Sequence, residues 1–173
     1  GLTGLGGTVA LGANTLTIIG NTNPDAFKGK ITGTGGLIKT GTGILTLIGA
    51  NTYTGGMTIN EGTVTGTTAG LVGKIVNNAA LIFNQSTTGS FGGVISGDGA
   101  LTKTGDGILI LTGENTFTGG TKLSSGIISI SSNNSLGSGL LTFNGGTLNT
   151  TQSMTIGLKM TLDSLGGAFK TDA

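Results

Sequence analysis

The sequence contains no cysteine, histidine, tryptophan or arginine, and these absences remove most of the side chains that carry enzyme chemistry. A nucleophile with an activating base has few candidates in such a chain. Only 9% of the residues are charged, and eight lysines against seven acidic residues give a net charge of +1. This charge provides no basic surface for nucleic acid or an anionic membrane. We therefore expect no enzymatic activity, no cofactor and no nucleic-acid partner, with a Ser–Lys or Thr-based arrangement as the remaining catalytic alternative.

Long apolar runs are also missing. No stretch approaches the roughly 18 apolar residues of a membrane-spanning helix. The first ten residues lack the basic start and apolar region of a signal peptide. We expect no direct membrane insertion of this segment. The lack of cysteine does not decide the compartment, because it fits the cytosol and also surface proteins that stay unfolded during export.

Glycine, threonine and asparagine are abundant instead, with 37 glycines in 173 residues. These residues suit strands and turns and are poor helix formers. The chain is 35% hydrophobic with a mean hydropathy of +0.30, which is too apolar for a disordered segment. The composition predicts an all-β fold with a buried core.

The sequence contains an internal duplication. Residues 27–64 align with residues 91–128 without a gap, and 20 of the 38 positions are identical. We find no linker or boundary between the copies, so residues 1–173 are expected to form one segment. Both ends stop within a repeat, which indicates an excerpt of a longer protein.

Within each copy, short apolar stretches alternate with glycine-rich turns, which is typical of short strands. Side chains two residues apart share one face of a strand. This parity places the following leucines in the core: Leu37, Leu45, Leu47, Leu101, Leu109 and Leu111. It also puts Thr46 and Ile48 on the exposed face. Lys39 and Lys103 share the parity of the buried leucines, so we expect the chain to bend after each lysine and let the ammonium reach water.

Short strands, glycine-rich corners and a long repeat favour a parallel β-helix. A coil of about 21 residues would fit three times into the repeat, and the chain would form about eight coils, uncapped at one or both ends. A β-sandwich is the alternative, because regularly spaced turns also suit that fold.

Residues 36–58 read GLIKTGTGILTLIGANTYTGGMT and residues 100–121 read ALTKTGDGILILTGENTFTGGT. Both stretches resemble the passenger-associated repeat of bacterial autotransporters, and they depart from its pattern at Met57, Ala100 and Phe117. The resemblance implies a right-handed parallel β-helix on the surface of a Gram-negative bacterium or released from it. It also implies export through a C-terminal outer-membrane barrel, and residues 153–173 show no series of barrel strands.

The octapeptides GANTYTGG (49–56) and GENTFTGG (113–120) are the most similar parts of the two copies. If exposed, the rings of Tyr53 and Phe117 could stack on sugars or pack against a protein. If they point inward, they would close the core. The candidate surface-contact residues are Asn51, Tyr53, Asn115 and Phe117. The glycines expected to permit the tight reversal are Gly55, Gly56, Gly119 and Gly120. Being three coils apart, the two rings are expected roughly 14 Å from each other along the rod.

Asp98 and Asp106 are the nearest pair of acidic residues. They lack the spacing of a calcium-binding β-roll, and Asp beside Gly is common in turns. We therefore expect turn residues and no metal site.

Two functions stay open. The first is a structural stalk or filament-forming segment that associates end to end or laterally. The second is an adhesin whose rod face binds glycan, a host protein or another copy of the chain.

Overall fold

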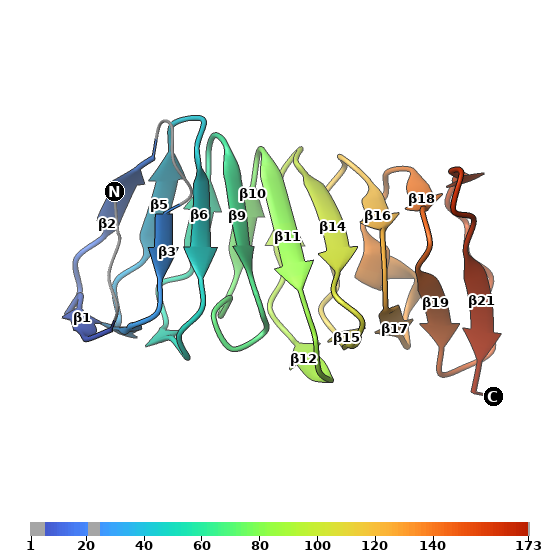
Figure 1. Cartoon of the computed structure of the whole chain (residues 1–173), viewed down its shortest axis with the longest axis horizontal. Coiled ribbons are helices and arrows are strands. Elements are labelled where there is room, and N and C mark those ends of the chain that lie inside the picture. The colour runs from blue at the N-terminus through green and yellow to red at the C-terminus, as the bar shows by residue number, and fades with distance from the viewer. Residues whose placement is uncertain (1–5, 21–24, 173) are drawn as a thin grey trace.

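The computed structural model describes residues 6–20 and 25–172, which wind into a parallel β-solenoid. Figure 1 shows the coils stacked side by side along one axis, with the two chain ends at opposite ends of the rod. Every strand pair among the described residues is parallel. The expected β-helix is therefore confirmed, and the antiparallel β-sandwich is not formed.

The solenoid has three faces, which the chain visits in the same order in each coil. Face 1 is one continuous sheet of eight strands, which sets the number of coils at about eight, as expected. Its strands are β3 (Asp25–Phe27), β6 (Ile44–Leu47), β9 (Thr63–Gly66), β11 (Ala80–Asn84), β14 (Ala100–Thr104), β16 (Thr121–Leu123), β18 (Leu141–Phe143) and β20 (Met160–Leu162).

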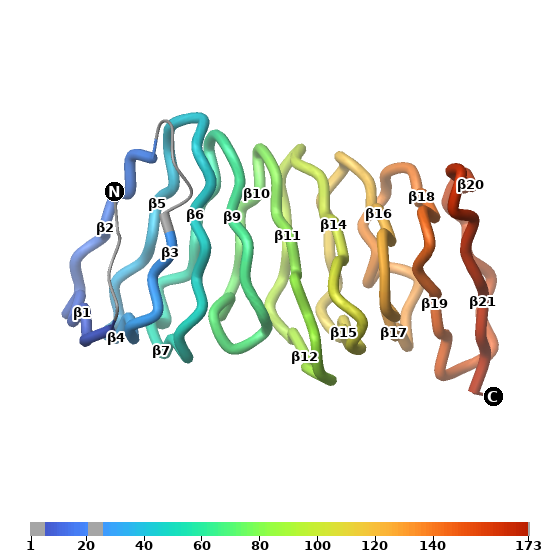
Figure 2. Tube along the Cα trace, viewed as in Figure 1, coloured from blue at the N-terminus to red at the C-terminus, as the bar shows by residue number. Residues whose placement is uncertain are grey.

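Face 2 follows face 1 along the chain and is divided into two sheets. The first sheet holds β1 (Thr8–Ala10), β4 (Lys30–Gly33) and β7 (Thr52–Tyr53). The second holds β12 (Gly89–Phe91), β15 (Ile108–Leu111), β17 (Ile127–Ile130), β19 (Thr147–Thr150) and β21 (Ala168–Thr171). The coil between these two sheets passes face 2 without a strand, through residues 67–74, as the trace in Figure 2 shows below β9.

Face 3 closes the coil and consists of five strands. These are β2 (Leu16–Ile19), β5 (Leu37–Thr40), β8 (Met57–Ile59), β10 (Ile75–Asn77) and β13 (Ile95–Ser96). Residues 115–118 extend this face by one layer, because the Thr116 N–H donates to the carbonyl of Ile95 at 2.9 Å. The 3₁₀ helix η1 (Asn133–Leu136) lies in the next coil.

Coil length is not constant along the rod. The shortest register step joins Thr63 to Ala80, and the longest joins Thr8 to Lys30. The strands keep their register because the variation is taken up in the turns.

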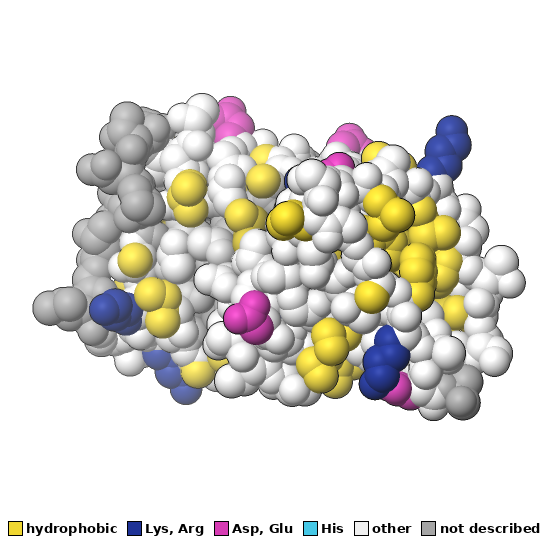
Figure 3. All heavy atoms as spheres, turned by 45° about the vertical axis from the view of Figure 1, so that its right-hand side comes forward, with side chains coloured by type: hydrophobic (Ala, Val, Ile, Leu, Met, Phe, Trp, Pro, Cys, Tyr) yellow, Lys and Arg dark blue, Asp and Glu magenta, His cyan; other side chains and the backbone are white. Residues whose placement is uncertain are grey.

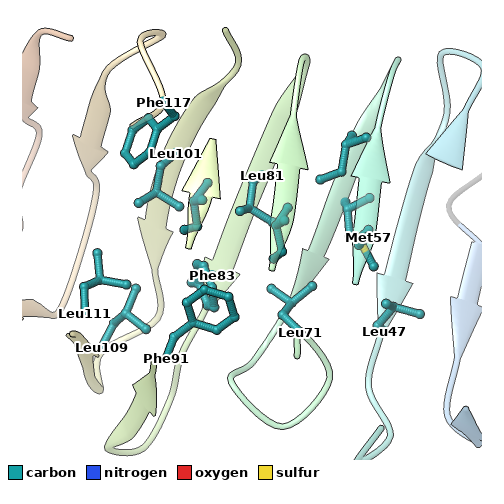
Figure 4. Close-up of a cluster of buried hydrophobic side chains, with 14 of the residues drawn as sticks. Leu47, Met57, Leu71, Leu81, Phe83, Phe91, Leu101, Leu109, Leu111 and Phe117 are labelled. Carbon is teal, nitrogen blue, oxygen red and sulfur yellow. The ribbon is translucent and has the colours of Figure 1, made fainter. Parts of the chain in front are cut away.

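The core is a stack of inward side chains that repeat from coil to coil. Figure 4 shows such side chains from successive strands gathered between the faces. All six leucines assigned to the core from parity are buried, with Leu37 the most exposed of them at 2%. Thr46 is half-buried and Ile48 is exposed, so the outward assignment also agrees with the structure.

The two repeats do not occupy equivalent faces. Starting from Leu37, the register partners on face 3 are Met57, Ile75 and Ile95, so three coils are complete at Ile95. The counterpart of Leu37 in the second repeat is Leu101, which lies further along the chain, on face 1.

The chain between corresponding positions of the two repeats therefore spans three coils and one further face. Thus β5 lies on face 3 but its counterpart β14 lies on face 1, and β6 lies on face 1 but its counterpart β15 lies on face 2. The expectation of three whole coils per repeat was wrong, because each of the three coils from Leu37 to Ile95 is shorter than the expected length of about 21 residues.

Candidate functional site

The rings of the octapeptides point into the core. Tyr53 is 2% exposed and Phe117 is fully buried, as Figure 4 shows for Phe117. Asn51 and Asn115 are each 5% exposed. The four residues considered as a surface-contact set therefore do not form an exposed surface, because an apolar ring at an inward position is removed from water when the next coil stacks on it.

Each octapeptide asparagine joins three consecutive coils. The side-chain oxygen of Asn51 accepts from the Ile31 N–H of the preceding coil at 2.8 Å, and its amide nitrogen donates to the Gly70 carbonyl of the following coil at 2.7 Å. Asn115 does the same with Ile95 and Ser135, at 2.8 and 2.6 Å. We call each of these arrangements an asparagine clamp. Buried backbone groups need such partners, since an unpaired group costs about 1–3 kcal/mol.

The glycine pairs of the octapeptides lie where neighbouring coils approach closely. A Cβ on Gly55 would lie 2.5 Å from the carbonyl carbon of Gly35, and a Cβ on Gly119 would lie 2.5 Å from that of Gly99. The following glycines, Gly56 and Gly120, have φ values of 80° and 89°. Side chains are excluded from the first position by space and from the second by backbone conformation.

The two lysines of the repeat are buried, which corrects the expectation that their ammonium groups reach water. Lys39 is 1% exposed and Lys103 is fully buried. Strand alternation continues to the lysine, and the turn that follows folds back over the ammonium group. The sequence parity was therefore the better guide, because backbone carbonyls replace the water that the charge would otherwise need.

Carbonyl oxygens surround each ammonium group. Lys39 Nζ donates to the carbonyls of Thr40 and Gly41 at 2.8 and 2.5 Å, and the carbonyl of Glu61 lies 3.4 Å away. Lys103 Nζ has four carbonyl oxygens within 2.5–3.4 Å, on Thr104, Gly105, Gln85 and Ser125. We call each arrangement a lysine cage.

Electrostatics at the Lys103 cage act in two directions. Burial lowers the pKa of the Lys103 ammonium, and the negative charge of Asp106 raises that pKa by a smaller amount. At the Lys39 cage the position of Asp106 is taken by Thr42, but Glu61 brings a carboxylate that accepts from the Gly41 N–H at 3.1 Å. Each cage thus has one acidic residue nearby, supplied from a different position.

Acidic residues outside the cages make local contacts. Asp98 accepts from the Thr118 hydroxyl at 3.1 Å, and Glu114 accepts from Ser132 and Asn134 at 3.1 and 2.7 Å. Across residues 6–20 and 25–172, no group of three or more acidic, His or Cys side chains is placed to hold a metal ion. No helix in this part of the chain has the length and hydrophobicity to cross a membrane.

The outer surface of the described residues carries few charges and several shallow hollows, among them one beside Glu114 and Asn115 and one groove of mixed character. Figure 3 shows only a few charged side chains, spread over the visible face. The groove, of about 410 Å³, lies on face 1 at the level of β6 and β9. It is lined mainly by hydroxyl, amide and aliphatic side chains: Thr46, Ile48, Thr65, Thr67, Asn84 and Ser86.

Sequence reasoning did not find the clamps or the cages as sites. Two signals could have indicated the cages: the lysine parity, and a glycine, Gly62 or Gly126, that recurs at the same spacing after each lysine. A Cβ on these glycines would lie 2.9 Å from Lys39 Nζ and 2.7 Å from Lys103 Nζ. The asparagines had been identified, but for turn formation and surface contact.

Comparison with known proteins agrees with this repeat structure. The passenger-associated transport repeat matches the chain twice, at residues 37–65 and 101–130. The adhesin BmaC autotransporter of Brucella suis biovar 1 (strain 1330) is 44% identical over 82 residues, which cover 46% of this chain and 2% of that protein. No solved structure matches the chain. The two matched repeats and this relative identify the chain as an autotransporter-like segment, of a cell-surface or secreted protein, that carries passenger-associated transport repeats.

Proposed function

We propose that this segment is a non-enzymatic structural stalk on the surface of a Gram-negative bacterium or in a protein released from it. The observation that carries the proposal is the inward direction of the repeated side chains. Asn51, Tyr53 and Lys39, with their counterparts Asn115, Phe117 and Lys103, are all buried. These three pairs of side chains therefore hold coils together and are not available to a partner, whereas the shared threonines beside them, Thr52 and Thr116, are exposed.

The second repeat lies one face further round the rod than the first, and this shift supports the same proposal. Outward-facing positions that correspond in the two repeats lie on different faces, as the half-buried Thr46 on β6 and Ile110 on β15 do. A binding surface that grows with repeat number would need equivalent positions in one row. Clamps and cages at different edges of the rod instead distribute inter-coil contacts around it, which suits a spacer.

The stalk proposal predicts that the isolated segment has no saturable ligand. We expect no binding above background on arrays of immobilised glycans and of host extracellular-matrix proteins, with the segment labelled at its C-terminus. Saturable binding that a charged substitution on one face abolishes would overturn the proposal.

An adhesin is the second candidate, favoured by the groove on face 1 and by the adhesin name of the matched relative. If the groove binds a glycan, Thr65→Lys should abolish binding because it places a long charged side chain in the lining. Thr58→Lys is the matched control, since Thr58 points outward from face 3. Equal binding by both variants would contradict a site in the groove.

We also propose that copies of the segment associate end to end. The last coil exposes Leu162, Leu165 and Phe169 by 56–70%, and Figure 3 shows hydrophobic side chains gathered near this end. Exposed strand edges and apolar side chains favour stacking of a further coil. Light scattering after size exclusion should show oligomers that Leu162→Lys disrupts. A wild-type segment that stays monomeric at high concentration would contradict this proposal.

A further inference from the structure

The lysine cages have the composition of a cation-binding site. The ammonium group of Lys103 has three N–H donors, and the four oxygens that surround it belong to backbone carbonyls. No carboxylate among the described residues lies within ion-pair distance of this nitrogen. The charge is therefore held by oriented carbonyl dipoles, as a small bound cation is.

The oxygens come from three different coils. Gln85 belongs to the coil before Lys103, Thr104 and Gly105 follow the lysine directly, and Ser125 belongs to the coil after it. Convergence of carbonyl oxygens in a buried corner is unfavourable unless a donor or cation lies between them. The ammonium group thus makes close approach of the three turns favourable.

The rest of the lysine side chain is apolar and packs in the core. In register, Lys103 lies between Phe83 and Leu123. Lys39 lies between Ile18 and Ile59 in the same way. A hydrocarbon channel that ends in a ring of carbonyls is complementary to a primary alkylammonium ion.

We propose that the corner formed by Lys–Thr–Gly is a binding site for a protonated primary amine, with the chain's own lysine as the ligand, and that closure of the three turns depends on the ligand's positive charge. The proposal holds whether the rod is a stalk or an adhesin. The nearby acidic groups are Asp106 at the Lys103 cage and Glu61 at the Lys39 cage.

Chemical rescue tests this proposal. Lys103→Ala removes three carbons and the ammonium group, which leaves space for propylammonium. Amides that close the corner, those of Gly107, Ser124 and Ile127, report on it because they donate to carbonyls of adjacent coils. We expect their hydrogen-exchange protection at pH 7 to fall roughly 10- to 100-fold in the variant. Propylammonium chloride should restore most of the protection.

A neutral compound of the same size separates charge from volume. Propan-1-ol fills the same space without charge, so it should not restore protection. Equal rescue by propan-1-ol would overturn the proposal, since the corner would then need only volume. Lys122→Ala is the control, because Lys122 is partly exposed in an ion pair with Asp163 at 3.2 Å. It should leave the three amides unchanged.

A second variant covers failure of Lys103→Ala to fold. Lys103→Met keeps an unbranched apolar side chain and loses the charge. We expect it to lose protection at the same three amides, while protection in the first three coils stays within about twofold of wild type. Wild-type protection at all three amides in Lys103→Met would overturn the proposal.

Discussion

At the scale of residues, Tyr53 is the only tyrosine of the chain, and its hydroxyl lies in the core near the Val72 backbone without a hydrogen bond of good geometry. Burial raises the pKa of Tyr53 well above its usual value, and the nearby Val72 backbone offsets this only in part. Above pH 10 the unfolded chain releases this proton while the folded chain keeps it. The unfolded state then binds fewer protons, so stability is lost as the pH rises.

We predict that the free energy of unfolding falls by about 1.4 kcal/mol per pH unit above pH 10 through Tyr53 alone. Urea denaturation of wild type and Tyr53→Phe between pH 8 and 12 measures the difference, because lysine titration is common to both proteins. Tyrosinate absorbance near 295 nm should appear only on unfolding. A folded protein that shows this absorbance near pH 10 would contradict the prediction.

Phe117 supplies the matched comparison, because it occupies the same place in its repeat without a hydroxyl. Tyr53→Phe removes a buried oxygen that has no hydrogen bond of good geometry, so at pH 7 we expect unchanged or slightly higher stability. Phe117→Tyr adds such an oxygen in the core and should cost about 1–3 kcal/mol. Equal effects of the two changes would show that the rings are not in equivalent surroundings.

Asn115 tests the asparagine clamp. Asn115→Ala leaves the Ile95 N–H and the Ser135 carbonyl without their partner. With two buried groups unsatisfied, we predict a loss of about 2–4 kcal/mol in the free energy of unfolding. Asn133→Ala, at an exposed position of η1, should change stability by less than about 0.5 kcal/mol. Urea titration followed by circular dichroism measures both variants.

At the scale of elements, the glycine corners decide how closely the strands stack. Gly119→Ala would place a Cβ 2.5 Å from backbone atoms of the preceding coil, at Asp98 and Gly99. Either the coils move apart or the strands twist, and we predict a loss of about 2–3 kcal/mol. Gly157→Ala meets nothing within 4 Å. Its stability should be unchanged or slightly higher, because alanine restricts the unfolded chain.

Thermal melting of the two glycine variants gives the comparison. A Gly119→Ala protein that melts with the wild type would mean that the corner is looser than the structure describes.

The element scale is also where reading the sequence was most successful. Alternation of apolar and polar residues placed Leu45 and Leu47 inward and Ile48 outward, because strand period depends only on local backbone geometry. Alternation also places Lys39 and Lys103 inward, and the expectation that their charge would bring them to water was wrong. A cationic side chain is costly to bury alone, and the carbonyls that compensate it come from turns whose proximity no local pattern indicates.

At the scale of the whole molecule, the rod should lengthen when repeats are added. We predict that inserting a second copy of residues 37–100 after Ala100 yields a folded rod longer by about 16 Å, at roughly 4.8 Å per coil. The junction is compatible because Leu101 occupies the place of Leu37 in its repeat. All strands after the insertion should move by one face.

Small-angle X-ray scattering measures the maximum dimension of both proteins, and circular dichroism measures strand content per residue. An insertion that leaves the maximum dimension unchanged, or that lowers strand content per residue, would contradict a modular stalk. The unmodified segment, with about eight coils, serves as the reference.

The sequence by itself determined the all-β class, the approximate number of coils, the core leucines and the repeat family. Each of these depends on local alternation, on glycine-rich turns or on similarity between the two copies. Only the tertiary structure showed that the octapeptide rings and the two repeat lysines are buried. It also showed that the second copy lies one face further round the rod than the first. This shift by one face depends on the lengths of the three coils that begin at Leu37, which bring Ile95 and not Leu101 into the row of Leu37 on face 3. Small differences in turn length accumulate along a solenoid, and they set which backbone groups of successive coils meet.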